Sequence, residues 1–315
     1  MQVSTSPVAL NSTTDFPKLD DLNRVLHYVL PCVSGLTMPI SIVNIVVMLN
    51  LGVLRSPSTI IYFTLILMDI LNALTGFLIT ADPESKHWKG VESNIYLFTF
   101  DATIVLIFGL AVVRLVFIKM SALRVLANLR KLAYSAALAS VLFGVFAVYY
   151  PHILHRLGYT KSFVNFAWLD LLELLFVFCT VVMSLYTWSV VRGSRSLIHS
   201  PVFKRANTTS LCITLNFIAS YTYYTFLNSA RMYYTLHQRD CPPRSWMMVL
   251  VCRDSLYIGV TAMCVHSLNN NIILMSQCHV REFIWSHLVY FSRDLKRKCS
   301  CNQTNESYRY FEDYA

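Results

Sequence analysis

The sequence predicts an all-α membrane protein, a seven-transmembrane helix bundle followed by a short amphipathic eighth helix. The chain has 315 residues, of which 55% are hydrophobic and only 14% are charged, and its mean hydropathy is +0.50. A soluble domain carries about 25% charged residues, so this chain has too few to cover a water-exposed surface. The apolar residues also form long runs rather than the short alternating segments of a transmembrane β-barrel.

Seven apolar runs are present, each close to the roughly 20 residues that cross the hydrocarbon core of a bilayer. The sixth run is the weakest, because Thr, Asn, Ser and Tyr interrupt it. We expect residues 1–24 to form an N-terminal segment, residues 25–275 the bundle, and residues 276–315 an amphipathic helix and tail. The expected spans are Val25–Leu54, Thr59–Thr80, Asn94–Ile118, Leu132–Leu154, Phe163–Val191, Thr208–Ala230 and Ser255–Met275.

The orientation of the bundle follows from the charges between the spans. The N-terminal segment is polar and contains a glycosylation sequon at Asn11, as an extracellular segment would. With the N-terminus outside, the inner loops and tail hold 15 Lys and Arg against 10 on the outer side. This bias satisfies the positive-inside rule. The sequence therefore predicts a multi-pass cell-membrane protein with an extracellular N-terminus. Its net charge of +9 indicates topology and contact with membrane lipids, not nucleic acid.

The segment Arg281–Lys298, after the last span, has apolar residues interleaved among basic ones. This pattern is typical of a helix that lies on the inner leaflet. Cys299 and Cys301 follow directly and are candidates for palmitoylation. The alternative is that they are unmodified cytosolic thiols.

Two further cysteines, Cys241 and Cys252, lie in or beside a predicted outer loop. They are candidates for a disulfide with each other, or one of them for a disulfide with Cys32. No cysteine spacing resembles a zinc site. The chain also contains no zinc-protease motif, nucleophile elbow or phosphate-binding loop, so no enzymatic activity is expected.

Five ionisable residues lie within the expected spans. Such residues are costly in lipid, so each is a functional hypothesis. The alternative is structural, with the groups satisfying one another across helices. The five are Asp69, Asp101, Arg114, Asp170 and Glu173.

Polar motifs in three spans carry a family resemblance. The first span contains Asn44, the second Leu65-Ile66-Leu67-Met68-Asp69, and the seventh Ser267-Leu268-Asn269-Asn270-Asn271-Ile272-Ile273-Leu274. In order and separation they resemble the Asn, Leu-Ala-x-x-Asp and Asn-Pro-x-x-Tyr motifs of the rhodopsin-like (class A) G-protein-coupled receptors.

The resemblance extends along the whole chain, with departures that mark a divergent member of orphan or chemosensory type. Phe217–Tyr224 is similar to the family's Phe-x-x-Cys-Trp-x-Pro-Tyr, and Val113-Arg114-Leu115 stands in place of Asp-Arg-Tyr. Asn271 and Leu274 replace the Pro and Tyr of the seventh-span motif.

A sodium pocket is one implication of this resemblance. If the family alignment holds, Asp69 faces Thr103, Ser267 and Asn270, whose oxygens would suit a small hard cation. Proton binding and a plain hydrogen-bond network are the alternatives. No other cofactor is expected.

A second implication concerns signalling. In the family, the arginine at the Arg114 position meets the G protein and is restrained by the preceding acid. Val113 removes that acid, which predicts raised resting activity. The alternative is that Arg114 extends to lipid phosphates.

A ligand site between the outer halves of the spans is a third implication. Its acids and aromatic rings favour a cationic or amine-bearing ligand, whereas the arginines around the outer mouth favour an anionic one, and both classes stay open. The candidate residues are Tyr96, Phe100, Asp101, Asp170, Glu173, Tyr221, Tyr224, Asn228 and Arg231.

The predicted function is therefore a receptor that binds an extracellular small-molecule or peptide ligand and signals to heterotrimeric G proteins. An odorant-type chemosensory receptor is one alternative, because the loops are short. A decoy or scaffold receptor that binds without signalling is another, because motifs are altered. An ion or proton transporter is less favoured, since the chain has no internal repeat and no pair of Gly/Pro-broken spans.

Overall fold

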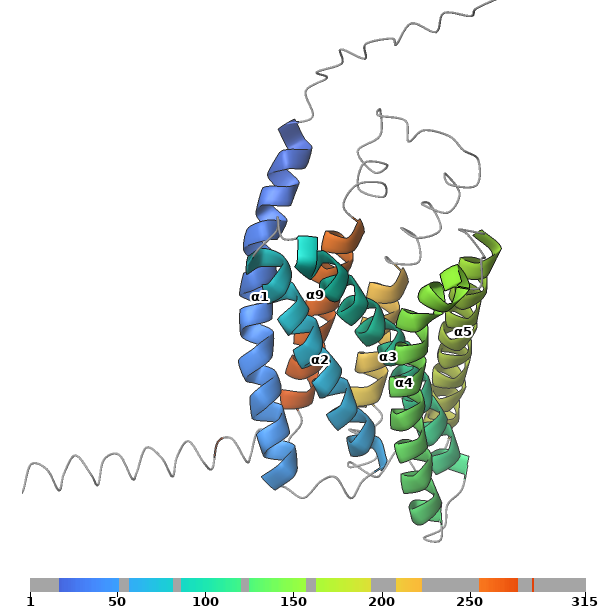
Figure 1. The fold of residues 1–315 in the computed structure, drawn as a ribbon. Coiled ribbons are helices and arrows are strands. Elements are labelled where there is room, and N and C mark those ends of the chain that lie inside the picture. The colour runs from blue at the N-terminus through green and yellow to red at the C-terminus, as the bar shows by residue number, and fades with distance from the viewer. Residues whose placement is uncertain are drawn as a thin grey trace, which may run out of the picture.

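The computed structural model describes residues 17–50, 57–81, 86–119, 125–156, 163–193, 208–222, 255–276 and 285. Over these residues the chain forms helices and no strand. The helices are α1 (Pro17–Asn50), α2 (Pro57–Ala81), α3 (Lys86–Lys119), α4 (Val125–Arg156), α5 (Phe163–Gly193) and α9 (Ser255–Met275), with a further helix over residues 208–222 (Figure 1).

Several predicted features lie outside the described residues. Of the predicted inner-leaflet helix, only Trp285 is described; it is helical and 68% exposed. For Asp170 the structure describes the backbone, within α5, but not the side chain. The other predicted residues that fall outside are Asn11, Tyr224, Asn228, Arg231, Cys241, Cys252, Cys299 and Cys301.

Among the described helices, five are long and apolar enough to cross a membrane, so the prediction of a helical membrane protein is confirmed. The helix over residues 208–222 is described over less than the length of a span. In α9 the apolar sequence is interrupted by a run of polar side chains from His266 to Asn271. The five helices contribute the spans His27–Asn50, Pro57–Thr80, Asn94–Lys119, Asn128–Tyr150 and Leu171–Arg192.

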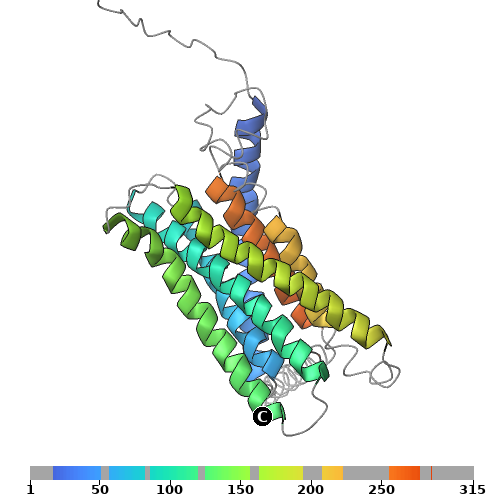
Figure 2. The same ribbon diagram turned by 90° about the vertical axis from the view of Figure 1, so that its right-hand side faces the viewer.

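The helix α3 lies at the centre of the bundle. It packs against α2, α4, α5 and α9, and α1 packs against α2 and α9. Figure 2 shows α3 and α4 running side by side along most of their length. In contrast, α4 and α5 leave large apolar side chains exposed, such as Leu142 and Phe178, as helices in contact with lipid do. Most of the buried side chains that contact one another therefore belong to α2, α3, α9 and the helix over residues 208–222.

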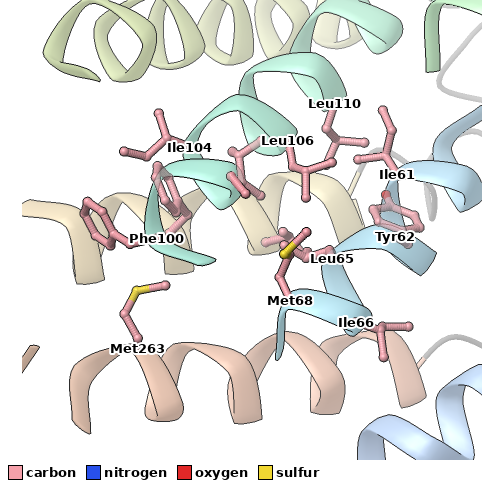
Figure 3. Packing of buried hydrophobic residues seen from close by; sticks show 14 of the residues in the cluster. Ile61, Tyr62, Leu65, Ile66, Met68, Phe100, Ile104, Leu106, Leu110 and Met263 are labelled. Carbon is pink, nitrogen blue, oxygen red and sulfur yellow. The ribbon is translucent and has the colours of Figure 1, made fainter. Parts of the chain in front are cut away.

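The apolar core forms where α2 and α3 meet, and α9 adds to it. Leu65 and Met68 of α2 lie beside Leu106 and Leu110 of α3, and Met263 of α9 packs nearby (Figure 3). All five side chains are buried. A close-packed interior of this kind holds the polar groups described below at fixed positions.

Glycines allow α3 and α4 to approach closely, which leads to a first prediction. A Cβ atom at Gly144 would lie 2.7 Å from the backbone oxygen of Phe98 and 2.8 Å from Cδ2 of its ring. We expect Gly144→Ala to lower the apparent melting temperature of the purified protein. Overpacking costs about 1–3 kcal/mol, and alanine gains about 1 kcal/mol in helix propensity over glycine. We expect the cost to exceed the gain, because the atom that the new Cβ meets is a backbone oxygen, which has little freedom to move.

The matched control is Gly35→Ala in α1, where the added Cβ would lie 3.7 Å from Cζ of Phe77, an ordinary contact. This variant should melt at or slightly above the wild-type temperature. A Gly144→Ala protein that melts no lower than Gly35→Ala would contradict the predicted clash.

Candidate functional site

A buried carboxylate, Asp69 of α2, is the centre of a polar network. Its side chain is 1% exposed. Its Oδ2 atom accepts a hydrogen bond from Nδ2 of Asn271 in α9 at 3.0 Å. Ser267 and Asn270, also on α9, lie close enough to the same carboxylate to influence it. The predicted proximity of Asp69 to Ser267 and Asn270 is therefore present in the structure.

The fourth residue of the expected cation pocket, Thr103, is buried in α3, and its hydroxyl hydrogen is donated within that helix. It donates to the backbone oxygen of Thr99 at 2.6 Å. A threonine in a helix commonly satisfies its hydroxyl in this way, on the carbonyl one turn earlier. The hydroxyl of Thr103 is thus bonded within its own helix rather than to Asp69.

Asn44 and Asn271 join α1 to this network. Nδ2 of Asn44 donates to the backbone oxygen of Asn271 at 3.1 Å and to its Oδ1 at 2.9 Å. Nδ2 of Asn271 in turn donates to the backbone oxygen of Ser267 at 2.8 Å and to Asp69. The side chain of Asn271 therefore bridges α1 and α2 from its position on α9.

A second polar chain connects α3 to the same centre. The hydroxyl of Thr99 lies 2.6 Å from Oδ1 of Asn72, to which it donates. Nδ2 of Asn72 donates to Oγ of Ser267 at 3.3 Å. Because Asn271 donates both to the backbone oxygen of Ser267 and to Asp69, the contacts run without interruption from α3 to the carboxylate.

The helix over residues 208–222 reaches the network through Asn216. Its Nδ2 atom lies 2.9 Å from Oδ1 of Asn270 and 3.0 Å from the backbone oxygen of His266. The imidazole of His266 is fully buried between the two amides: Nδ1 lies 3.0 Å from Nδ2 of Asn216, and Nε2 lies 2.8 Å from Nδ2 of Asn270. This part of the network ties the helix over residues 208–222 to α9.

An aromatic column lies beside this network and contains three of the predicted ligand-binding residues, Tyr96, Phe100 and Tyr221. The rings of Tyr96 and Phe100 stack with centroids 5.9 Å apart, and Phe100 and Tyr221 stack at 5.7 Å. Phe217 continues the column, 5.6 Å from Tyr221 and 5.8 Å from the ring of His266. We predicted these rings as walls of a ligand site, whereas here they are buried against one another.

Two of the predicted acids, Asp101 of α3 and Glu173 of α5, lie on helices that pack against each other. They are 2% and 5% exposed. The same faces of the two helices meet at Phe108 and Phe176, whose ring centroids are 5.1 Å apart. Asp101 precedes Phe108 by about two turns and Glu173 precedes Phe176 by about one, so helical spacing places both acids on the side of the interface nearer the N-terminus of α3.

Arg114 lies close to the C-terminal end of α3 and is partly buried, and Val113 beside it is fully buried. The phenol of Tyr62, in α2, lies near the guanidinium group and near Ser210 of the helix over residues 208–222. The sequence prediction rests on Val113, the neighbour in the chain, and does not include Tyr62, which lies in a different helix.

Several residues of the network were not singled out from the sequence. Asn72 follows Asp69 by three positions, so the two share a helix face, and this spacing was the available signal. His266 and Asn270 are likewise one turn apart. Asn271 was considered only as the replacement of a proline, although a buried amide needs partners.

The described residues include no group of three or more His, Cys, Asp and Glu side chains that is placed to hold a metal ion. Cys32, Cys179, Cys212 and Cys264 are free thiols, so Cys32 forms no disulfide here. In comparisons with known proteins, no family model and no curated protein matches the chain.

Proposed function

We propose that the chain is a seven-transmembrane receptor of the rhodopsin-like, G-protein-coupled type, with an extracellular N-terminus in the cell membrane. It binds an extracellular small molecule or peptide and signals to heterotrimeric G proteins. One observation carries this proposal: an unbroken set of contacts leads from the aromatic column to the buried carboxylate of Asp69. A receptor needs such a connection, because ligand binding on one side must change helix packing on the other.

Thr99 is the point at which the aromatic column meets the polar network. It lies between Tyr96 and Phe100 in α3, and its hydroxyl bonds to Asn72 of α2. A ligand that moves these rings relative to Tyr221 also moves Thr99, since all of them are held by the rigid helix α3. The bond from Asn72 to Ser267 then passes the displacement to α9, whose Asn271 donates to Asp69.

The acids of the α3–α5 interface are the groups through which a ligand would be selected. Buried carboxylates in a membrane protein require a proton, a cation or a hydrogen-bonding partner. Asp101 and Glu173 would pair with a cationic or amine-bearing ligand, with the aromatic rings beside them adding cation–π contact. Arg114, at the opposite end of α3, would contact the G protein.

Agonist-free G-protein activation in cells tests this function. We expect the wild-type chain to signal above mock-transfected cells, Arg114→Ala to fall to the mock level, and Val113→Asp to signal less than wild type because it adds an acid beside Arg114. All three are compared at matched surface expression. If all three equal mock-transfected cells, unliganded signalling through Arg114 is rejected, and a decoy receptor becomes the favoured function.

A further inference from the structure

The chemistry around Asp69 determines which partner its carboxylate can take. An ionised carboxylate only accepts hydrogen bonds. Nδ2 of Asn271 is the donor whose hydrogen bond to Asp69 is seen, and Ser267 and Asn270 lie beside the carboxylate. A donated N–H group carries positive partial charge, so it performs part of the electrostatic role that a bound cation would perform.

The orientation of the Asn271 amide is fixed by its neighbours. Nδ2 lies between two groups that only accept, the Asp69 carboxylate at 3.0 Å and the backbone oxygen of Ser267 at 2.8 Å. Oδ1 faces a donor, Nδ2 of Asn44, at 2.9 Å. Exchanging the nitrogen and oxygen would set oxygen against oxygen and nitrogen against nitrogen. Both hydrogens of Nδ2 are therefore committed, one of them to Asp69.

These groups do not fit a sodium ion. A hard cation binds through several oxygen atoms with available lone pairs. The atom of Asn271 that faces the carboxylate is a nitrogen, which cannot ligate the ion because both of its hydrogens are donated to oxygen atoms. Of the side chains described here as contacting Asp69 or Asn271, only Asn44 has a buried oxygen without a hydrogen-bond partner, its Oδ1. One amide oxygen does not make a coordination shell.

We propose that the Asn271 amide replaces a cation at Asp69, so that the carboxylate is closed to sodium and the stability of the bundle does not depend on that ion. The amide is always present, because Asn271 is part of α9. The occupancy of a bound ion would instead depend on the concentration of that ion. The inference concerns the interior of the bundle and holds whether or not the chain signals to a G protein.

Thermal unfolding of the full-length protein in lipid nanodiscs tests the proposal, with sodium chloride compared against choline chloride at equal ionic strength. We expect the wild-type melting temperatures in the two salts to agree within about 1 °C, since an ion that does not bind the native state does not stabilise it. Asn271→Ala removes the amide and opens the carboxylate, so this variant should melt several degrees higher in sodium than in choline. Asn269→Ala, an exposed amide two positions earlier, is the control and should behave as wild type.

A wild-type protein that sodium stabilises, with the gain abolished by Asp69→Asn, would overturn the proposal. If sodium still raises the melting temperature of the Asp69→Asn variant, the ion binds at another site, and this result supports a closed Asp69 carboxylate. If Asn271→Ala folds and remains insensitive to sodium, the amide is not what excludes the ion, and the proposal fails. Asn271→Ser serves in its place if the alanine variant does not fold, and the wild-type comparison is decisive without either.

Discussion

Replacing Asn271 with leucine is expected to reduce the stability of the bundle more than any other single change considered for this protein. Leucine has a similar size but leaves Nδ2 of Asn44 with one partner fewer and removes one donor from the Asp69 carboxylate. Neutral hydrogen bonds between membrane helices are worth about 0.6 kcal/mol each, and those to a charged group about 1.5–3 kcal/mol. We therefore expect a loss of roughly 3 kcal/mol, measured as a lower apparent melting temperature in nanodiscs.

The neighbouring amide provides the matched control. Asn269 is exposed, and its side chain makes one long bond, 3.3 Å to Oδ1 of Asn216. Asn269→Leu should therefore change the melting temperature little. A double variant separates the contacts. If Asn44 acts partly through the side chain of Asn271, adding Asn44→Ala to Asn271→Leu lowers the stability by less than Asn44→Ala does alone; the remaining loss comes from the bond to the backbone oxygen of residue 271. Equal melting of Asn271→Leu and Asn269→Leu would show that the bridge adds no stability.

The helices were predictable because the apolar runs that determine them are local and long. The span predicted from Asn94 is confirmed, and the span in α4 begins at Asn128 rather than Leu132. The helices themselves start earlier than the spans: α3 begins at Lys86 and α4 at Val125. Hydropathy detects where a helix enters lipid, but a helix continues into polar sequence as long as its backbone bonds are satisfied. Pro17 at the start of α1 illustrates the difference, since proline suits the first helical turn whatever its hydropathy.

The candidate site was predictable to the extent that it depends on spacing within one helix. Ser267 and Asn270 are three positions apart and face the same neighbour, Asp69. What spacing does not determine is the direction of each hydrogen bond. The hydroxyl of Thr103 prefers the carbonyl of its own helix, and the amide of Asn271 is oriented by Asn44, which belongs to α1. Such choices depend on tertiary packing and so were absent from the sequence pattern.

The surroundings of Arg114 were not predictable for the same reason, because they depend on packing between helices. The sequence indicated that Val113, its neighbour in the chain, carries no charge. It did not indicate that α2 brings Tyr62 next to the guanidinium group. Contacts between helices decide the surroundings of a residue near a helix end, because its own helix supplies only the neighbours three and four positions away.

Removing the hydroxyl of Tyr62 is expected to raise agonist-free signalling, if the chain signals as proposed. The phenol of Tyr62, in α2, lies near Arg114 of α3 and near Ser210 of the helix over residues 208–222. Tyr62→Phe keeps the ring but removes the hydroxyl, which is the polar group available to hold the guanidinium in its resting position. A loss of about 1 kcal/mol from the resting state changes the ratio of active to resting receptor roughly fivefold. The measurement is the rate of G-protein activation without ligand, at matched surface expression.

Two variants show whether the raised signalling of Tyr62→Phe depends on Arg114. Tyr134→Phe removes a hydroxyl from an exposed tyrosine of α4 and should leave resting activity unchanged. Tyr62→Phe combined with Arg114→Ala should signal no more than Arg114→Ala alone, because the residue that Tyr62 restrains is then missing. If Tyr62→Phe signals at or below the wild-type level while reaching the surface normally, Tyr62 does not restrain Arg114. The absence of an acid at Val113 would then be the feature that sets the resting activity, as the sequence alone predicts.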